Sequence, residues 1–205
     1  MGCVPKIKLI GANKMTRLIL VRHGQTDWNL TKRIQSYTDV PLNEIGRSQT
    51  QQAAIKLKDI KIDVIYSSPL SRAYESAKII AQYHDGIEII KEPAWTEINM
   101  GEWEGMFTKE AQEKIPECRQ WLIDPFSVTP PSGESALDLK KRVISKLDQI
   151  INLSQDKTIC LVAHQMTNTI IKCHYQNLPF SWNLLPGNAD WEKITIKCQV
   201  KLRNY

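Results

Sequence analysis

A short apolar run joins a polar segment near the start of the chain, in Leu18-Ile19-Leu20-Val21-Arg22-His23-Gly24-Gln25-Thr26. Consecutive aliphatic residues are typical of a strand that is buried on both faces of a sheet. Arginine, histidine and glycine follow directly where that strand ends. The sequence therefore predicts a buried strand that delivers Arg22 and His23 to one edge of a sheet.

Strand-like and helix-like runs alternate along the rest of the chain. Further strands are predicted over residues 63–66, 87–90, Thr158–Ala163 and Trp191–Lys197. Helices are predicted from the N-cap Asn43 to residue 58, from Pro69 as the first helical residue to residue 84, and over 134–153 and 167–175. Residues 95–131 are rich in glycine and proline, which indicates short helices over the top of the sheet.

Strands separated by helices indicate a mostly parallel sheet covered on both faces. The fold class predicted is therefore α/β, as one three-layer α/β/α domain over residues 15–205. Residues 1–14 are interpreted as a flexible N-terminal extension. The chain of 205 residues is long enough to bury a core without disulfides or metals.

Charge and cysteine content exclude several classes of protein. Four of the 27 basic residues lie within residues 1–17, which hold no acid, and the remainder has 23 basic and 22 acidic residues. No basic stripe marks the folded part, so no nucleic-acid partner is expected. The five cysteines form no CxxC pair, which favours reduced thiols in the cytoplasm, with Cys160 as a core residue. Apolar runs are too short for a bilayer, so no membrane partner is expected.

The positions of two histidines and one arginine indicate a common site. His23 and His164 each follow a predicted strand, and Arg72 lies in the first turn of a helix after the strand over 63–66. Ligands of open α/β sheets bind at the carboxyl ends of the strands, so these three side chains are expected to converge there. His84 and His174 match no such position and are interpreted as structural.

Phosphoryl transfer through histidine needs a neutral imidazole, cations for the phosphoryl oxygens and an acid for the leaving oxygen. Arg22 supplies a guanidinium beside His23, and Gly24 supplies a backbone that allows close approach. Neighbouring arginines are expected to lower the pKa of His23 and keep its lone pair available.

Several motifs in order along the chain resemble those of the histidine phosphatase superfamily, in its phosphoglycerate-mutase-like branch. The resemblance covers residues 16–196 and rests on these segments: the opening stretch with Trp28-Asn29, Asp39-Val40-Pro41-Leu42 with Gly46, Ser67-Ser68-Pro69-Leu70-Ser71-Arg72-Ala73, Glu97-Ile98 with Gly101-Glu102-Trp103-Glu104-Gly105, Pro131-Ser132-Gly133-Glu134-Ser135 with Asp138 and Arg142, and Ala163-His164.

The resemblance implies a phosphatase whose nucleophile is His23, which forms a phosphohistidine. It also implies that Glu97 is the general acid and then the base that activates water. The phosphoryl group would be held by Arg22, Gly24, Asn29, Arg72, His164 and Gln165. Neither a metal nor a cofactor is implied, and no His or Cys spacing is typical of a zinc site.

The chain departs from the family pattern at two places. Gln25 stands where many members carry Glu, which is a mild variation. Gln165-Met166 follow His164 where many members have two glycines, and this added bulk bears on the substrate. The His164-Gln165 pair and Trp121 with Asp124-Pro125 resemble α-ribazole phosphatases, so α-ribazole 5′-phosphate in cobalamin synthesis is a candidate substrate.

Three alternatives stay open at this point. A phosphoglycerate mutase and a metal-independent phosphoserine phosphatase are similar to the chain, but both typically carry a longer closing tail, which favours hydrolysis of another small phosphorylated metabolite here. A non-catalytic scaffold would be expected to lack one of the site residues, and all are present. A homodimer is compatible with the sequence, which leaves the oligomeric state open.

Overall fold

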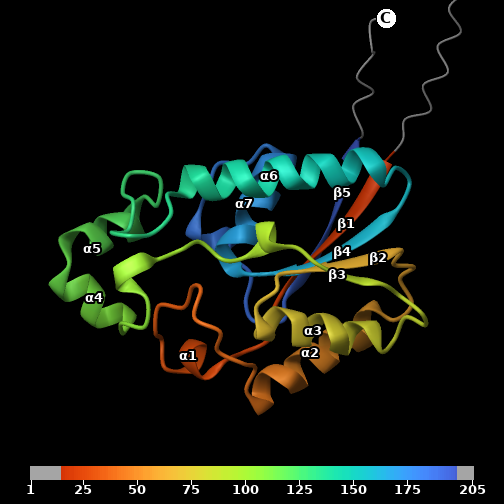
Figure 1. Ribbon diagram of the computed structural model, residues 1–205, viewed down its shortest axis with the longest axis horizontal. Helices are drawn as coiled ribbons and strands as arrows, with labels where there is room; N and C mark the ends of the chain where they lie inside the picture. Colours follow the sequence, from red (N-terminus) through yellow and green to blue (C-terminus); the bar gives the residue numbers. More distant parts are fainter. Residues whose placement is uncertain (1–14, 198–205) are drawn as a thin grey trace, which may run out of the picture.

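Five strands form one sheet in the order β3-β2-β4-β1-β5, with helices on both faces (Figure 1). The computed structural model describes residues 15–197, so the predicted extension over 1–14 lies outside the described residues. The strands are β1 (Met15–Arg22), β2 (Val64–Ser67), β3 (Ile89–Lys91), β4 (Thr158–Ala163) and β5 (Trp191–Lys197). All pairs are parallel except β1 with β5, which confirms the predicted α/β fold with a mostly parallel sheet.

The pairing of β1 with β4 brings two distant histidines to the same edge. Arg22 is paired with Ala163, the last residues of the two strands. The next residues are His23 and His164, and the His23 N–H donates a hydrogen bond to Ala163 O at 3.1 Å. The parallel register therefore juxtaposes both histidines without any further constraint.

Alternate residues of the central strands pack into two separate cores. Leu18 and Leu20 of β1 lie in the larger core, under α6 (Ala136–Leu153) and α7 (Gln165–Gln176). Ile19 and Val21 lie in the smaller core with residues of α2 (Glu44–Leu57) and α3 (Ser71–Ala81). Figure 1 shows these two helix pairs on opposite faces of the sheet. Because β1 is buried on both faces, polar and apolar residues do not alternate along Leu18–Val21.

The helices that flank the sheet follow the predictions in type, but all except α2 differ from them at their starts. Asn43 caps α2 as expected, since its side chain accepts from the Gly46 N–H. Pro69 is not the first residue of α3, and that prediction was wrong. Leu70 is extended, and the Ser71 N–H at the true start donates to Asp39 Oδ1 at 2.7 Å. A carboxylate from a distant loop thus caps the helix in place of a local residue.

Residues 95–131 contain three of the predicted short helices: η2 (Gly101–Trp103), α4 (Thr108–Lys114) and α5 (Pro116–Ile123). Figure 1 shows α4 and α5 beyond one end of α6. Another short helix, η1 (Pro93–Trp95), ends where this segment begins. Two further short helices, α1 (Asp27–Leu30) and η3 (Trp182–Leu184), were not predicted. No helix within residues 15–197 is both long enough and apolar enough to cross a membrane.

Candidate active site

A cavity of about 200 Å³ opens at the carboxyl ends of β1 and β4. Seven of the eight predicted site residues line it: Arg22, His23, Asn29, Arg72, Glu97, His164 and Gln165. They come from β1, α1, α3, the loop after η1 and the start of α7. Segments that are far apart in the sequence therefore meet around one small space.

His23 is held with one ring nitrogen bound and the other free to react. Its Nδ1 lies 2.7 Å from Gly24 O, a carbonyl that can only accept, so Nδ1 carries the proton and Nε2 keeps its lone pair. The ring is 4% exposed. Burial, and then the positive charges of Arg72 and Arg22, hold the pKa of His23 well below its ordinary value. A neutral imidazole, as nucleophilic attack requires, is the stable form at neutral pH.

His164 lies against His23, with ring centroids 5.1 Å apart. Its Nε2 is 2.8 Å from the Ser68 hydroxyl, and its buried Nδ1 has no hydrogen-bond partner among the described residues. Burial is the main cause that lowers the pKa of His164, with Arg72 and His23 adding to it. When the Ser68 hydroxyl donates to Nε2, the proton of the neutral ring lies on Nδ1 and can be donated to a ligand. Ser68 was quoted above only as part of a motif, and its link to His164 was missed.

Arg72 is a guanidinium buried in the fold, with only 1% of its surface exposed. Its Nη1 donates to Thr38 O at 3.0 Å and its Nη2 to Ser36 O at 2.7 Å. The Nε atom has no partner among the residues described. Burial lowers the pKa of Arg72 to about 10, which still leaves it charged at neutral pH. Two carbonyls thus fix the guanidinium, and the Nε–H group remains for a ligand.

Arg22 and Gln165 are both held by one carbonyl of the loop before β5. Arg22 Nη1 donates to Pro186 O at 2.8 Å, and Gln165 Nε2 donates to the same oxygen at 3.3 Å. Asn188 of this loop donates to Asn29 Oδ1 at 3.0 Å. Within the described chain no acceptor is paired with Arg22 Nε, which is buried. The role of this loop was not predicted from the sequence.

The Glu97 carboxylate lies at the N-terminus of α7. Its Oε2 accepts from the Met166 N–H at 3.1 Å, and its Oε1 accepts from the N–H groups of Ile98 at 3.0 Å and Thr167 at 3.3 Å. The first N–H groups of a helix lack intrahelical partners and need an oxygen acceptor from elsewhere. Glu97 therefore caps α7 and is held rigidly while it lines the cavity. This contact explains why α7 begins at Gln165, two residues before the predicted start.

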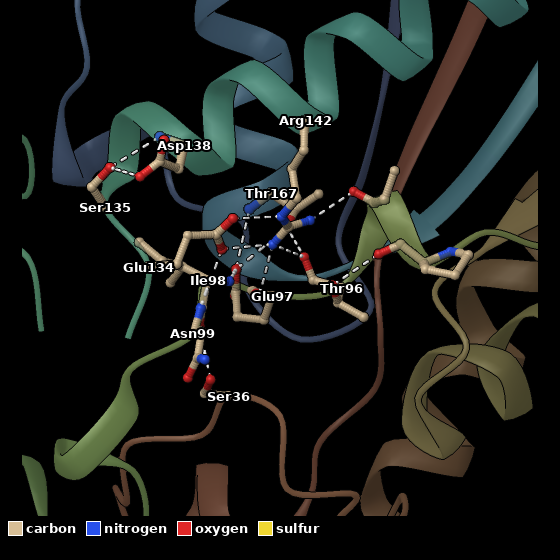
Figure 2. A network of polar contacts seen from close by, with 12 residues as sticks. Ser36, Thr96, Glu97, Ile98, Asn99, Glu134, Ser135, Asp138, Arg142 and Thr167 are labelled. Atoms are coloured by element: carbon tan, nitrogen blue, oxygen red, sulfur yellow. Dashed lines mark hydrogen bonds and ion pairs between the residues drawn. The ribbon is translucent and has the colours of Figure 1, made fainter. Parts of the chain in front are cut away.

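Arg142 of α6 holds the backbone segment that carries Glu97 (Figure 2). Its Nη1 donates to Ala94 O at 2.8 Å, and its Nη2 donates to the carbonyls of Thr96 and Glu97, each at 3.0 Å. The Glu134 carboxylate accepts from Nε at 2.6 Å and from Nη2 at 2.9 Å. A bidentate ion pair of this kind is geometrically specific, so Arg142 and Glu134 fix the position of Glu97.

A model of the histidine phosphatase superfamily (branch 1) matches residues 18–200 of the chain. The chain belongs to this superfamily. Members of the superfamily are phosphatases or mutases, and this chain is an enzyme of that kind. The family resemblance drawn from the motifs is therefore confirmed.

Relatives within the superfamily carry different names. Phosphoserine phosphatase 1 of Hydrogenobacter thermophilus is 36% identical over 183 residues, 88% of this chain and 86% of that protein. Phosphoglycerate mutase-like protein 4 of Arabidopsis thaliana is 35% identical over 150 residues, 72% of this chain but 65% of that longer protein. The α-ribazole phosphatase of Shigella flexneri superposes with a TM-score of 0.78 over 86% of this chain and 89% of its own, at 22% identity, which shows the shared fold alone.

Gly24 is the one predicted ligand-binding residue that does not line the cavity. A Cβ at this position would lie 2.2 Å from Gly46 O and 2.6 Å from Thr50 Oγ1. The glycine is therefore required for close packing of the loop against α2, and its carbonyl orients His23. The backbone at Gly24 approaches α2 closely, and the predicted contact of Gly24 with a ligand stays a prediction.

The remaining candidate groups stay outside the site. Cys160 is fully buried in the smaller core, and burial raises the pKa of its thiol to about 12, which confirms it as a core residue. His84 and His174 do not line the cavity. Among the residues that the structure describes, no group of three or more His, Cys, Asp or Glu could hold a metal ion.

Proposed function

We propose that the chain hydrolyses a small phosphomonoester without a metal, through a phosphohistidine on Nε2 of His23. The observation that supports this most strongly is the neutral, buried imidazole of His23 beside three donors that lack a partner among the described residues: Arg22 Nε, Arg72 Nε and His164 Nδ1. Buried polar groups are almost always paired, so unpaired donors around one cavity favour an anion with several acceptor oxygens. A phosphoryl group has that chemistry.

In the first step His23 Nε2 attacks phosphorus, and the bond from phosphorus to the ester oxygen breaks. Glu97 donates its proton to that oxygen, which leaves as the alcohol. In the second step Glu97 takes a proton from water, whose oxygen attacks phosphorus. The N–P bond then breaks and inorganic phosphate is released. Arg22, Arg72 and His164 hold the equatorial oxygens in both steps. Catalysis of phosphoryl transfer consists mainly of positioning the reacting groups and stabilising the charge on these oxygens.

The natural substrate is proposed from residues at the floor of the cavity. Gln165 and Met166 line the cavity in place of two small residues, as the resemblance to α-ribazole phosphatases suggested. We therefore propose α-ribazole 5′-phosphate as the first substrate to test, with phosphoserine as the alternative that the 36% identical relative supports. Activity that requires a bisphosphoglycerate primer would instead favour the mutase. The free thiols of Cys118, Cys160 and Cys173 support a cytoplasmic enzyme.

Hydrolysis of p-nitrophenyl phosphate is expected to persist at full rate in EDTA, because protein cations hold the phosphoryl oxygens. The measurement is the initial rate before and after chelation and dialysis, with a Mg²⁺-dependent phosphatase treated in parallel. A rate that disappears with EDTA and returns with added Mg²⁺ would contradict the proposed mechanism.

Glu97→Gln is expected to slow the hydrolysis of alkyl phosphates by about a hundredfold and that of p-nitrophenyl phosphate far less. Only the poor leaving group of an alkyl phosphate needs a proton from the enzyme. Glutamine keeps the size of the side chain and can still accept hydrogen bonds through one oxygen. Glu102→Gln is the matched control, because Glu102 pairs with Ser132 and does not line the cavity. Equal losses on both kinds of ester would remove Glu97 as the acid.

A further inference from the structure

The cavity continues from the histidines to a second end lined by two tryptophans. Trp121 comes from α5 and Trp182 from η3, and their ring centroids lie 5.5 Å apart with a 57° tilt. Met100, Leu122 and Cys118 line the same cavity and add apolar surface. Trp121 is 6% exposed, so its indole forms part of a largely dry wall. This end is suited to a flat apolar group.

Both indole N–H groups at this end lack an acceptor. Trp121 Nε1 and Trp182 Nε1 are buried, and no side chain or carbonyl of residues 15–197 accepts from either. A buried indole N–H usually finds a partner, because leaving it unpaired costs free energy. Trp95 Nε1 is also unpaired, but Trp95 does not line this cavity. Two N–H groups without a protein acceptor therefore belong to side chains that line the cavity.

Among the described residues, no free carboxylate lines the cavity to pair with the ammonium group of an amino acid. Glu97 is the only carboxylate of that lining, and it is held at the N-terminus of α7. Arg33 also lines the cavity, where its Nη1 donates to Gly105 O at 2.9 Å and its guanidinium lies 4.1 Å from the Phe107 ring centroid. An amino-acid ester would therefore place its ammonium group in this cavity without a free counter-charge.

We propose that Trp121 and Trp182 select phosphomonoesters whose alcohol carries a flat, uncharged ring with a hydrogen-bond acceptor. The ring lies against the indoles, and its acceptor takes an indole N–H. This specificity rests on the proposed phosphatase function and makes phosphoserine a poor substrate. The two tryptophans act on the leaving alcohol and leave the chemistry at His23 unchanged.

The test compares kcat/KM for three alkyl phosphates with similar leaving groups, at a pH where pyridine is neutral. Phenylethyl phosphate is expected to exceed ethyl phosphate by about 30-fold, because a ring is removed from water. Pyridylethyl phosphate is expected to exceed phenylethyl phosphate by about fivefold, which is one net hydrogen bond. Phosphoserine is expected to react no faster than ethyl phosphate, and 3-phosphoglycerate more slowly than phenylethyl phosphate.

Variants separate the ring contact from the hydrogen bond. The double variant Trp121→Phe with Trp182→Phe is expected to lose the preference for pyridylethyl over phenylethyl phosphate. Trp121→Ala is expected to lose the preference for phenylethyl over ethyl phosphate. Each preference is a ratio within one protein sample, so partial unfolding does not affect it. Trp191→Phe is the matched control, because Trp191 lies on β5 and does not line this cavity. It is expected to keep both ratios.

Three outcomes would overturn the inference. The specificity would be refuted if phosphoserine or 3-phosphoglycerate had the highest kcat/KM of these esters. It would also be refuted if the tryptophan variants kept both kcat/KM ratios. In either case the phosphatase function would stand. Failure of the wild-type protein to hydrolyse any of the esters would refute the proposed function and the specificity with it.

Discussion

His23→Ala is expected to reduce phosphatase activity to the uncatalysed background. The variant removes the atom that bonds to phosphorus, and no other described group offers a neutral nitrogen at that place. His164 cannot substitute, since its Nε2 is held by Ser68 and its Nδ1 is the proposed proton donor. Initial rates on p-nitrophenyl phosphate measure the loss, and a folded variant is established by its circular dichroism.

The same variant tests the intermediate directly. Rapid acid-free quenching after mixing with a ³²P-labelled ester is expected to leave an acid-labile, base-stable label on the wild-type protein and none on His23→Ala. His174→Ala is the matched control, because His174 is exposed on α7 and contacts Tyr175 outside the cavity. Label retained by His23→Ala, or more than a few per cent of wild-type activity, would refute His23 as the nucleophile.

Arg72→Ala is expected to lower kcat/KM by about a thousandfold, the size of effect known for arginines that stabilise transferring phosphoryl groups. The guanidinium is buried and held by two carbonyls, so no reorganisation is needed when charge develops. Arg72→Lys is expected to recover little of this kcat/KM, because an ammonium group cannot replace a planar guanidinium that binds both carbonyls and the ligand. Steady-state kinetics on one alkyl ester measure both variants.

Loss of stability must be separated from loss of catalysis for Arg72. Removing the guanidinium leaves Ser36 O and Thr38 O without their donor. Because Ser36 is buried, the loss at its carbonyl alone costs about 1–3 kcal/mol. Melting temperatures and active-site titration therefore accompany the kinetics. Arg47→Ala is the matched control, since Arg47 pairs with Glu44 and Glu75 outside the cavity. A loss of less than tenfold for fully folded Arg72→Ala would show that Arg72 does not stabilise the transition state.

Helix starts at the site illustrate the limit of local prediction. Asn43 and the start of α2 were predicted because the cap and the helix are adjacent in the sequence. The starts of α3 and α7 were misplaced because Asp39 and Glu97 cap them from distant segments. Propensity and capping rules read a few neighbouring residues, so they cannot register a carboxylate supplied by another part of the fold.

The residues that position the site were the hardest to predict. Ser68 orients His164, and Pro186 binds Arg22 and Gln165 through its carbonyl. A serine beside a proline and a backbone carbonyl carry no distinctive sequence signal. Gly24 was predicted to allow close approach of the backbone to the ligand, and its packing against α2 was not predicted. Such roles depend on which surfaces meet after folding.

By itself, the sequence determined the strands that end next to His23 and His164, the mostly parallel sheet and most of the predicted residues that line the cavity. These follow from apolar periodicity and from residue chemistry, both of which are local properties of the chain. The tertiary structure alone decided the burial that keeps His23 neutral, the carbonyls that hold Arg72, and the meeting of Trp121 with Trp182. Burial and contact between distant residues arise only from packing, because they depend on the path of the whole chain.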